Sequence, residues 1–263
     1  MITHDLHIHT HLSDCADRQA FIADYIARAK ELGLTTIGFA DHAWDDKVGG
    51  ASPWYKKQPF SRLASRKHEL DGIDTNGIDV RLGAEGEYAN FLLGMTDAVF
   101  EHVDYVIVPH SHTHMVGFVL PEDCNNDPKN HAKYLAESFI SLCRHDIKDR
   151  FFGVAHPMSP IGKNAAQTEE IYSFISDAML NECASAAKES GVLLEANLSI
   201  LKNIPPEANE SFCLHRFFDA CKRAGCKFFL GSDAHNIASL TRHTESDTLL
   251  SYVGLSEDDF VKL

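Results

Sequence analysis

The feature that most constrains the fold is a regular alternation of strand-like and helix-like segments. Short runs rich in β-branched and aromatic residues recur along the chain, and amphipathic stretches fill most of the gaps between them. The strand-like runs lie near 2–8, 34–40, 78–84, 103–109, 151–155, 191–196 and 227–231. The helical patterns cover 16–33 and about 58–72, 131–146, 168–190 and 210–225. Seven such units predict an α/β protein with a mostly parallel sheet.

The chain reads as a single domain over residues 1–263, because no Pro/Ser-rich linker and no charge run divides it. The stretch 44–60 has no period and is predicted to be a long loop. Its aromatic residues Trp44, Trp54 and Tyr55 could close over a substrate. Alternatively, they could hold the loop against the rest of the domain.

The charge and the cysteines limit the class of partner. A net charge of −14 argues against a nucleic-acid groove, which needs a basic footprint. It does not argue against a small phosphorylated molecule, since bound metal ions supply local positive charge. The seven cysteines form no CxxC pair, as in proteins of a reducing compartment. With no apolar run near ~18 residues and no signal-peptide pattern, we expect a cytoplasmic protein without a membrane partner.

Metal-competent side chains stand at the end of every predicted strand. In parallel β/α architectures these ends meet at one edge, where functional groups gather. In chain order the residues are His7 and His9, Asp41 and His42, Glu85 and Glu87, His110, His112 and His114, His156, Glu195 and Asn197, and Asp233 and His235.

The spacing of the first and last groups favours metal binding. Side chains two positions apart on a strand point to the same face, so His7 and His9 can hold one ion together, as can Asp233 and His235. Imidazole and carboxylate suit Zn, Mn and Fe. A lone HxH is also compatible with a solvated strand face. The convergence of seven strand ends favours the metal site.

Six segments together resemble one family. They are "DLHIHTHLSD", "FADH", "GAEGEY", the histidine-rich turn after "VIVP", "AHP" and "GSDAH", and they span residues 5 to 235. They resemble the PHP (polymerase and histidinol phosphatase) family of metal-dependent phosphoesterases. The resemblance implies a distorted seven-stranded (β/α) TIM-like barrel, two or three divalent ions and hydrolysis of phosphate esters.

The resemblance also implies metal ligands, which are His7, His9, His42, Glu85, His156, Asp233 and His235. Glu85 matches the glutamate that bridges two ions, and Glu87 is interpreted as its support. After the fourth strand His112 is the expected ligand. His114 could be a further ligand or a phosphate contact, and His110 shares their spacing.

Two acidic residues have alternative roles. Asp14 stands where some family members have a ligand for a third ion, but Asp also caps helices, and Cys15 and Asp17 compete for this position. Asp41 is interpreted as orienting a ligand, and so are Glu195 and Asn197.

The mechanism follows from the metals. Two divalent ions roughly 3.5–4 Å apart can hold a bridging hydroxide that attacks phosphorus in line. The leaving alkoxide would take its proton from Asp233, His235 or His114. Arg242 and Arg18 are the expected phosphate anchors, although surface charge is an alternative for the basic residues of the loops.

We therefore expect hydrolysis of a small phosphate monoester resembling histidinol phosphate. One alternative is a phosphodiesterase or exonuclease acting on nucleotides, which the acidic balance disfavours. Another is a non-catalytic regulatory domain that binds metal, which the complete set of ligands disfavours. An amidohydrolase also begins with HxH but needs an eighth strand, for which too little chain follows His235.

Overall fold

The strands form two parallel sheets and one short hairpin in the computed structural model, which describes residues 2–204 and 212–263. The first sheet has the order β1-β2-β3 and the second β10-β9-β8-β7-β4. Their bounds are β1 His4–Ile8, β2 Thr36–Phe39, β3 Asp79–Leu82, β4 Ala84–Glu85, β7 Val106–Pro109, β8 Gly153–Ala155, β9 Leu193–Asn197 and β10 Phe228–Gly231. The hairpin pairs β5 (Tyr88–Ala89) with β6 (Leu92–Leu93). All seven predicted runs contain strands.

The predicted mostly parallel α/β fold is confirmed, but a closed barrel is not. The third run is divided at Gly83, so that β3 pairs with β2 while β4 pairs with β7. At the other edge, β1 meets the chain after β10 through one isolated bridge between Ile8 and Ala234. Within the first sheet, the pairing of β1 with β2 shifts its register between Asp5 and Ile8. The two sheets therefore face one another edge to edge without one continuous ladder.

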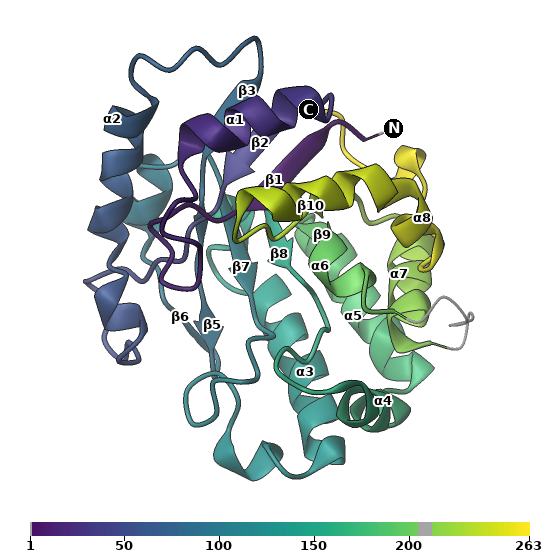
Figure 1. Ribbon diagram of the computed structural model, residues 1–263. Helices are drawn as coiled ribbons and strands as arrows, with labels where there is room; N and C mark the ends of the chain where they lie inside the picture. The colour runs from purple at the N-terminus through teal and green to yellow at the C-terminus, as the bar shows by residue number, and fades with distance from the viewer. Residues whose placement is uncertain (1, 205–211) are drawn as a thin grey trace.

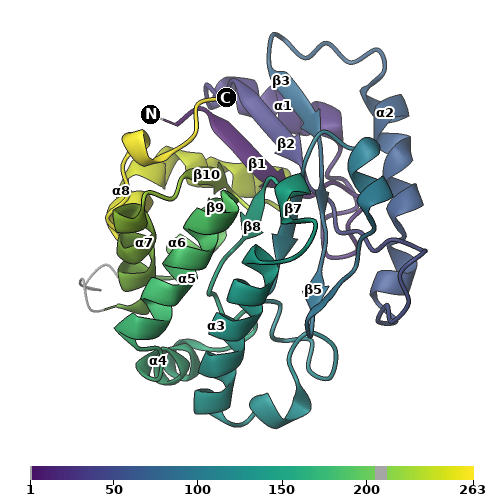
Figure 2. The same cartoon turned by 180° about the vertical axis from the view of Figure 1, so that it is seen from behind.

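The helices surround the strands on the outside (Figures 1 and 2). They are α1 Ile22–Glu31, α2 Ser65–Leu70, α3 Pro128–Cys143, α4 Ala165–Ser173, α5 Asp177–Ser190, α6 Leu198–Leu201, α7 Cys213–Ala224 and α8 Ser246–Ser251. The helix predicted over 168–190 is two helices, because the Ser176 hydroxyl accepts from the backbone N–H of Met179 and begins α5. Residues 210 and 211 of the last predicted helix lie outside the described residues.

Short 3-10 turns complete the connections. They are η1 Tyr55–Lys57, η2 Phe60–Ala64, η3 Asp97–Glu101, η4 Glu122–Cys124, η5 Lys148–Arg150, η6 Ile237–Glu245 and η7 Glu257–Asp259. Across residues 2–204 and 212–263, no helix has both the length and the apolar character needed to cross a membrane.

Three apolar clusters hold the sheets and helices together. The largest joins α3, α5 and α7 to the second sheet, with Phe139, Phe217 and Phe228 fully buried. The second seats α1 on the first sheet. The third combines Leu6 of β1 with Ile107 of β7 and Phe229 of β10. This third cluster links the two sheets from within, below the strand ends that carry the polar residues.

Candidate metal centre

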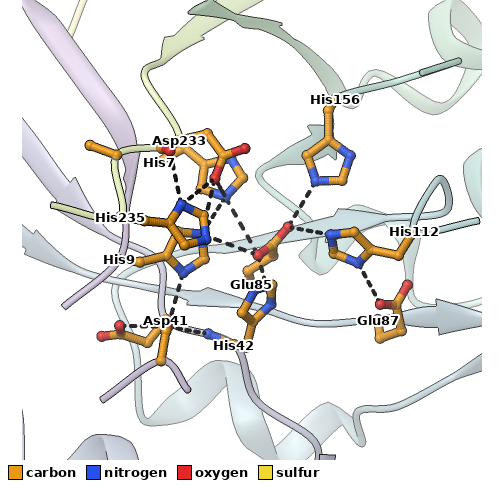
Figure 3. A network of polar contacts seen from close by, with 12 residues as sticks. His7, His9, Asp41, His42, Glu85, Glu87, His112, His156, Asp233 and His235 are labelled. Atoms are coloured by element: carbon orange, nitrogen blue, oxygen red, sulfur yellow. Dashed lines mark hydrogen bonds and ion pairs between the residues drawn. The ribbon is translucent and has the colours of Figure 1, made fainter. Parts of the chain in front are cut away.

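Histidines and carboxylates from both sheets converge at the carboxyl ends of the strands (Figure 3). The members are His7, His9, His42, Glu85, His112, His156, Asp233 and His235. Glu85 is fully buried at their centre, and His235 is the most open, with 33% of its side chain exposed. Residues from six strand ends, far apart in sequence, thus share one site.

Glu85 stands between two groups of imidazoles. Its Oε2 lies 2.8 Å from Nδ1 of His42 and 3.5 Å from Nε2 of both His7 and His9. Its Oε1 lies 3.1 Å from Nε2 of His156 and 3.9 Å from Nε2 of His112. One carboxylate with imidazoles on both oxygens has the arrangement of a ligand that bridges two cations.

Asp233 also lies beside the imidazoles that face Oε2 of Glu85. Its Oδ1 lies 3.3 Å from Nε2 of His9 and 3.4 Å from Nδ1 of His235. Its backbone has a φ of 52°, and that of His156 is 29°, in the left-handed region that side chains rarely adopt. His156 follows directly after β8 and Asp233 lies two residues after β10, so both conformations occur where the chain leaves a strand beside the cluster.

In four of the candidate histidine ligands, Nδ1 forms a hydrogen bond with a side-chain oxygen on the side of the ring away from the centre. The pairs are His7 with Glu195 (2.8 Å), His9 with Ser13 (2.9 Å), His112 with Glu87 (2.6 Å) and His156 with Ser111 (2.7 Å). Glu195 also accepts from the backbone N–H of His156. In each case Nε2 remains directed at the centre. This is how outer partners orient metal-binding imidazoles, and Glu87 and Glu195 lie where the sequence interpretation put them.

The electrostatics favour charged carboxylates. Burial would raise the pKa of Glu85, but His42 and His7 hold it well below its ordinary value. Burial likewise opposes the charge of Asp233, and His7 and His9 hold its pKa well below the usual range. Burial opposes the charge on His7 too, yet the Glu195, Glu85 and Asp233 carboxylates raise its pKa well above the ordinary value.

The donor atoms fit divalent cations. The Nε2 atoms of His7 and His9 lie only 3.1 Å apart, and a hydrogen can occupy that space for one ring only. Glu85 Oε2 and His42 Nδ1 are buried without a well-aligned hydrogen-bond partner. Leaving such groups unsatisfied costs about 1–3 kcal/mol each. In the described part of the chain, three groups of residues each bring one possible ligand atom per residue to within 4.8 Å of the others. These possible cation groups are His9-His42-His235, His7-His9-Glu85 and Glu85-His112-His156.

The turn after β1 places Asp14 and Arg18 outside this cluster. Asp14 Oδ1 accepts from both terminal nitrogens of Arg62 at 3.2 Å. The Arg18 side chain is 71% exposed, and its Nη2 lies 3.9 Å from Oδ1 of Asp14. Cys15 lies outside the possible cation groups of the described residues. Partial burial raises the pKa of its thiol, but the interactions with His235 and His42 lower it to about 6.

The three histidines of the turn after β7 have different surroundings. His112 joins the cluster. His110 points into the core, where its Nε2 accepts from the Met158 N–H at 3.2 Å and burial lowers its pKa to about 3. His114 is exposed, with its ring 5.7 Å from that of His112. His114 has no contact with Glu85 or Asp233 among the interactions of the described residues.

The remaining predicted residues lie around the cluster. Arg242 donates from Nη1 to the carbonyl oxygens of Ser232 (2.9 Å) and Asp233 (3.3 Å), directly behind a candidate ligand. Asp41 is fully buried and accepts hydrogen bonds from the N–H and the hydroxyl of Thr10. Its interpretation as an orienting residue, rather than a ligand, agrees with this geometry.

The loop over residues 44–60 is held against the site. Trp44 is 2% exposed and packs against Tyr55, with ring centroids 5.6 Å apart. The Tyr55 hydroxyl donates to Glu87 Oε2 at 2.9 Å. The Trp54 ring lies 4.9 Å from that of His42 and forms a wall of the site. Sequence reasoning singled out these aromatics but had no signal for their polar partner.

Comparison with known proteins agrees with the geometry. Residues 5–199 match the PHP domain. The chain belongs to the PHP domain family. A probable phosphatase of Pectobacterium carotovorum subsp. carotovorum (strain PC1) is 25% identical over 261 residues, covering 98% of this chain and 89% of that protein. Family membership and the ligand cluster make this PHP protein a metal-dependent phosphoesterase.

Two solved structures share the fold. One is the histidinol phosphate phosphatase of Lactococcus lactis subsp. lactis Il1403, complexed with zinc, L-histidinol and phosphate. It has a TM-score of 0.58 at 16% identity, over 97% of this chain and 94% of that one. The other, assigned as a histidinol phosphatase from Listeria monocytogenes, has a TM-score of 0.62 at 13% identity, over 92% and 99% of the two chains. At these identities the likeness concerns the fold.

Proposed function

We propose that this PHP protein hydrolyses a small phosphate monoester resembling histidinol phosphate, using two or three divalent ions of Zn, Mn or Fe. The observation that carries the proposal is Glu85, whose two oxygens face separate imidazole groups. Phosphoryl transfer requires mainly that negative charge be neutralised and the reacting groups positioned. A bridged pair of cation sites provides both.

The ligand roles in this proposal follow the cluster. The metal ligands would be His7, His9, His42, Glu85, His112, His156, Asp233 and His235. Bound divalent ions would neutralise the phosphoryl oxygens and lower the pKa of water at the site. Asp14 is the predicted ligand of a third ion, and Cys15, whose pKa the neighbouring His235 and His42 lower to about 6, competes with it for this position.

Phosphate binding and proton transfer fall to residues beside the ligands. Arg242, anchored behind Asp233, is the proposed phosphate contact, with exposed Arg18 the second candidate. Among the three candidates for proton transfer, His114 is the least suited to donate, because partial desolvation of its ring and the neighbouring His112 lower its pKa to about 4. Asp233 and His235 remain the candidates for handling the proton of the leaving group.

Two features favour a small substrate over a nucleic acid. The net charge of −14 opposes binding to a polyanion. The Lactococcus lactis protein of the same fold binds L-histidinol and phosphate. A phosphodiesterase or exonuclease, and a non-catalytic metal-binding domain, are the alternatives that the experiment distinguishes.

The test is an activity screen on protein reconstituted separately with Zn, Mn and Fe. The substrates are histidinol phosphate, sugar phosphates, p-nitrophenyl phosphate, bis-p-nitrophenyl phosphate and a dinucleotide. We expect kcat/KM for a monoester to exceed that for either diester by at least about tenfold, which corresponds to about 1.4 kcal/mol. A preference for a diester would contradict the proposal, as would bound metal without hydrolysis of any ester.

A matched pair of variants ties the activity to the cluster. Asp233→Ala and His9→Ala should each lose metal and activity while the fold is retained. Elemental analysis and circular dichroism measure both properties on the same samples. Unchanged metal content in both variants would reject these residues as ligands.

A further inference from the structure

Arg66 is a buried cation that the catalytic proposal does not use. It lies in α2 with a relative exposure of 1%. Its Nη1 donates to the Phe39 carbonyl at 2.9 Å, and its Nη2 donates to the Gly83 carbonyl. These carbonyls stand at the ends of β2 and β3. Removing a guanidinium from water costs several kcal/mol unless it is paired, so its partner is informative.

That partner is Asp41, which is fully buried. Arg66 Nη1 donates to Asp41 Oδ2 at 3.1 Å. The Thr10 hydroxyl donates to the same oxygen at 2.9 Å, and the Thr10 N–H donates to Oδ1. The Ser13 hydroxyl also donates to Oδ1, at 2.8 Å. Asp41 thus ties the turn after β1 to the guanidinium of α2.

The Ser13 hydroxyl determines which ring nitrogen of His9 carries the hydrogen. A hydroxyl has one hydrogen, and that of Ser13 is given to Asp41, which as a carboxylate can only accept. Toward Nδ1 of His9, 2.9 Å away, Ser13 can therefore only accept. Hence Nδ1 of His9 carries the hydrogen, and Nε2 presents its lone pair.

That lone pair faces the cluster. His9 Nε2 lies 3.3 Å from Asp233 Oδ1 and 3.5 Å from Glu85 Oε2. His9 also belongs to two of the possible cation groups. The tautomer required for binding a cation at Nε2 is the one that the hydrogen bonds from Arg66 through Asp41 and Ser13 select.

We infer that Arg66 is a positioning residue of the metal centre, acting through Asp41 and Ser13 to hold His9 in the tautomer that can bind a cation. The inference rests on the proposed function for the presence of that cation. The competing explanation is that Arg66 only joins the ends of β2 and β3. It predicts a less stable protein with an unchanged centre.

The test compares four variants of the full chain. Arg66→Met removes the guanidinium, and Arg66→Lys keeps the charge with fewer donors. Ser13→Ala breaks the connection to His9 while leaving the Arg66 contacts with the strand ends in place. Arg81→Met is the control, because Arg81 in β3 pairs with the half-exposed Asp79 and lies outside this set of contacts.

Two measurements are made on each folded variant. Competition with a chromophoric chelator gives the Kd for Zn²⁺, and ¹⁵N NMR of the histidine rings in metal-free protein reports the His9 tautomer. We expect Arg66→Met and Ser13→Ala to raise the Kd by about 10- to 100-fold and to abolish the single Nδ1–H tautomer. Arg66→Lys should recover part of the affinity, and Arg81→Met should match the wild type.

The inference is overturned if folded Arg66→Met retains both the wild-type Kd and the wild-type tautomer, even with a lower melting temperature. Should Arg66→Met fail to fold, Ser13→Ala decides in the same way. Absence of Zn²⁺ binding by the wild type would instead overturn the proposed function, since the tautomer measurement needs no metal.

Discussion

His110 and His112 show how local backbone direction separates a core histidine from a candidate ligand. Their spacing of two predicts a common face, as on a strand. However, β7 ends at Pro109, and the chain beyond it is no longer extended. His110 therefore turns to Ser138 of α3, with Nδ1 2.9 Å from the hydroxyl, while His112 turns to Glu85. The alternation rule applies only within the strand.

The adjacent residues Asp14 and Cys15 allow a direct test of the third ligand position. We expect Cys15→Ala to weaken binding of one ion, because His235 and His42 lower the pKa of the Cys15 thiol to about 6 and so favour the thiolate, which binds metal ions. Asp14→Ala should bind like the wild type, since its carboxylate is paired with Arg62. Co²⁺ binding reports the difference, because a thiolate ligand adds a charge-transfer band in the near ultraviolet. The same band in Cys15→Ala, or its loss in Asp14→Ala, would reverse this assignment.

Metal binding should release protons at neutral pH. Burial opposes the charged form of His7 and His42, but the surrounding carboxylates raise the pKa of each well above 6.5 in the metal-free protein. These rings are then protonated at pH 7 and must lose a proton to bind a cation. Affinity for Zn²⁺ should rise with pH until those pKa values are passed. Calorimetry in buffers of different ionisation enthalpy measures the release, and a heat independent of buffer would contradict it.

Adjacent strands approach one another closely at their carboxyl ends, where Gly231 has no side chain. Glu195 of β9 holds Nδ1 of His7 in β1 and the N–H of His156 after β8. Gly231 of β10 lies between them, since a Cβ there would overlap Glu195 Oε1 and approach the His7 Cβ to 2.6 Å. The close approach of three strands therefore depends on the absence of a side chain at one position.

The substitution Gly231→Ala tests this arrangement. The added methyl must displace Glu195 or His7, so we expect Zn²⁺ affinity to fall by about tenfold or more, with destabilisation of about 1–3 kcal/mol. Gly49→Ala is the control, because its Cβ would meet no atom within 4 Å. Chelator competition and urea unfolding measure the two effects. Equal behaviour of the two variants would show that the strand ends can adjust.

At the scale of the whole molecule, the centre joins two sheets that share no continuous ladder. The first sheet supplies His7, His9 and His42 from the ends of β1 and β2. The second supplies the remaining candidates through β4, β7, β8 and β10. Ions held between them would connect the sheets where isolated bridges stand in place of a ladder, as at Ile8 with Ala234 and at His42 with Glu85.

Removing metal should therefore lower thermal stability. A ligand that binds only the folded state stabilises it by about 2.7 kcal/mol at a free concentration of 100 times Kd. We expect a lower melting temperature after chelation and recovery on adding Zn²⁺, measured by circular dichroism. Asp233→Ala should show a smaller Zn²⁺-dependent shift. Identical melting of chelated and Zn²⁺-loaded wild type would argue against a cation that connects the sheets.

The sequence alone determined which segments contain strands and which strand ends carry candidate ligands. Periodicity is a local property, since burial of one face imposes a repeat on each short segment. All seven predicted runs accordingly contain strands, and candidate ligands from six of their ends meet around Glu85. The PHP motifs extended this reading to an enzyme class because they are short, local and in a fixed order.

Tertiary structure alone decided whether the sheets close, where His110 points, and that Asp14 of the turn after β1 pairs with Arg62. It also revealed the contacts of Arg66 with Asp41 and of Tyr55 with Glu87, which join residues 25 and 32 positions apart. Such pairs have no period or fixed spacing. They form only when packing brings their elements together, because a buried donor or acceptor must find its partner wherever the fold places one.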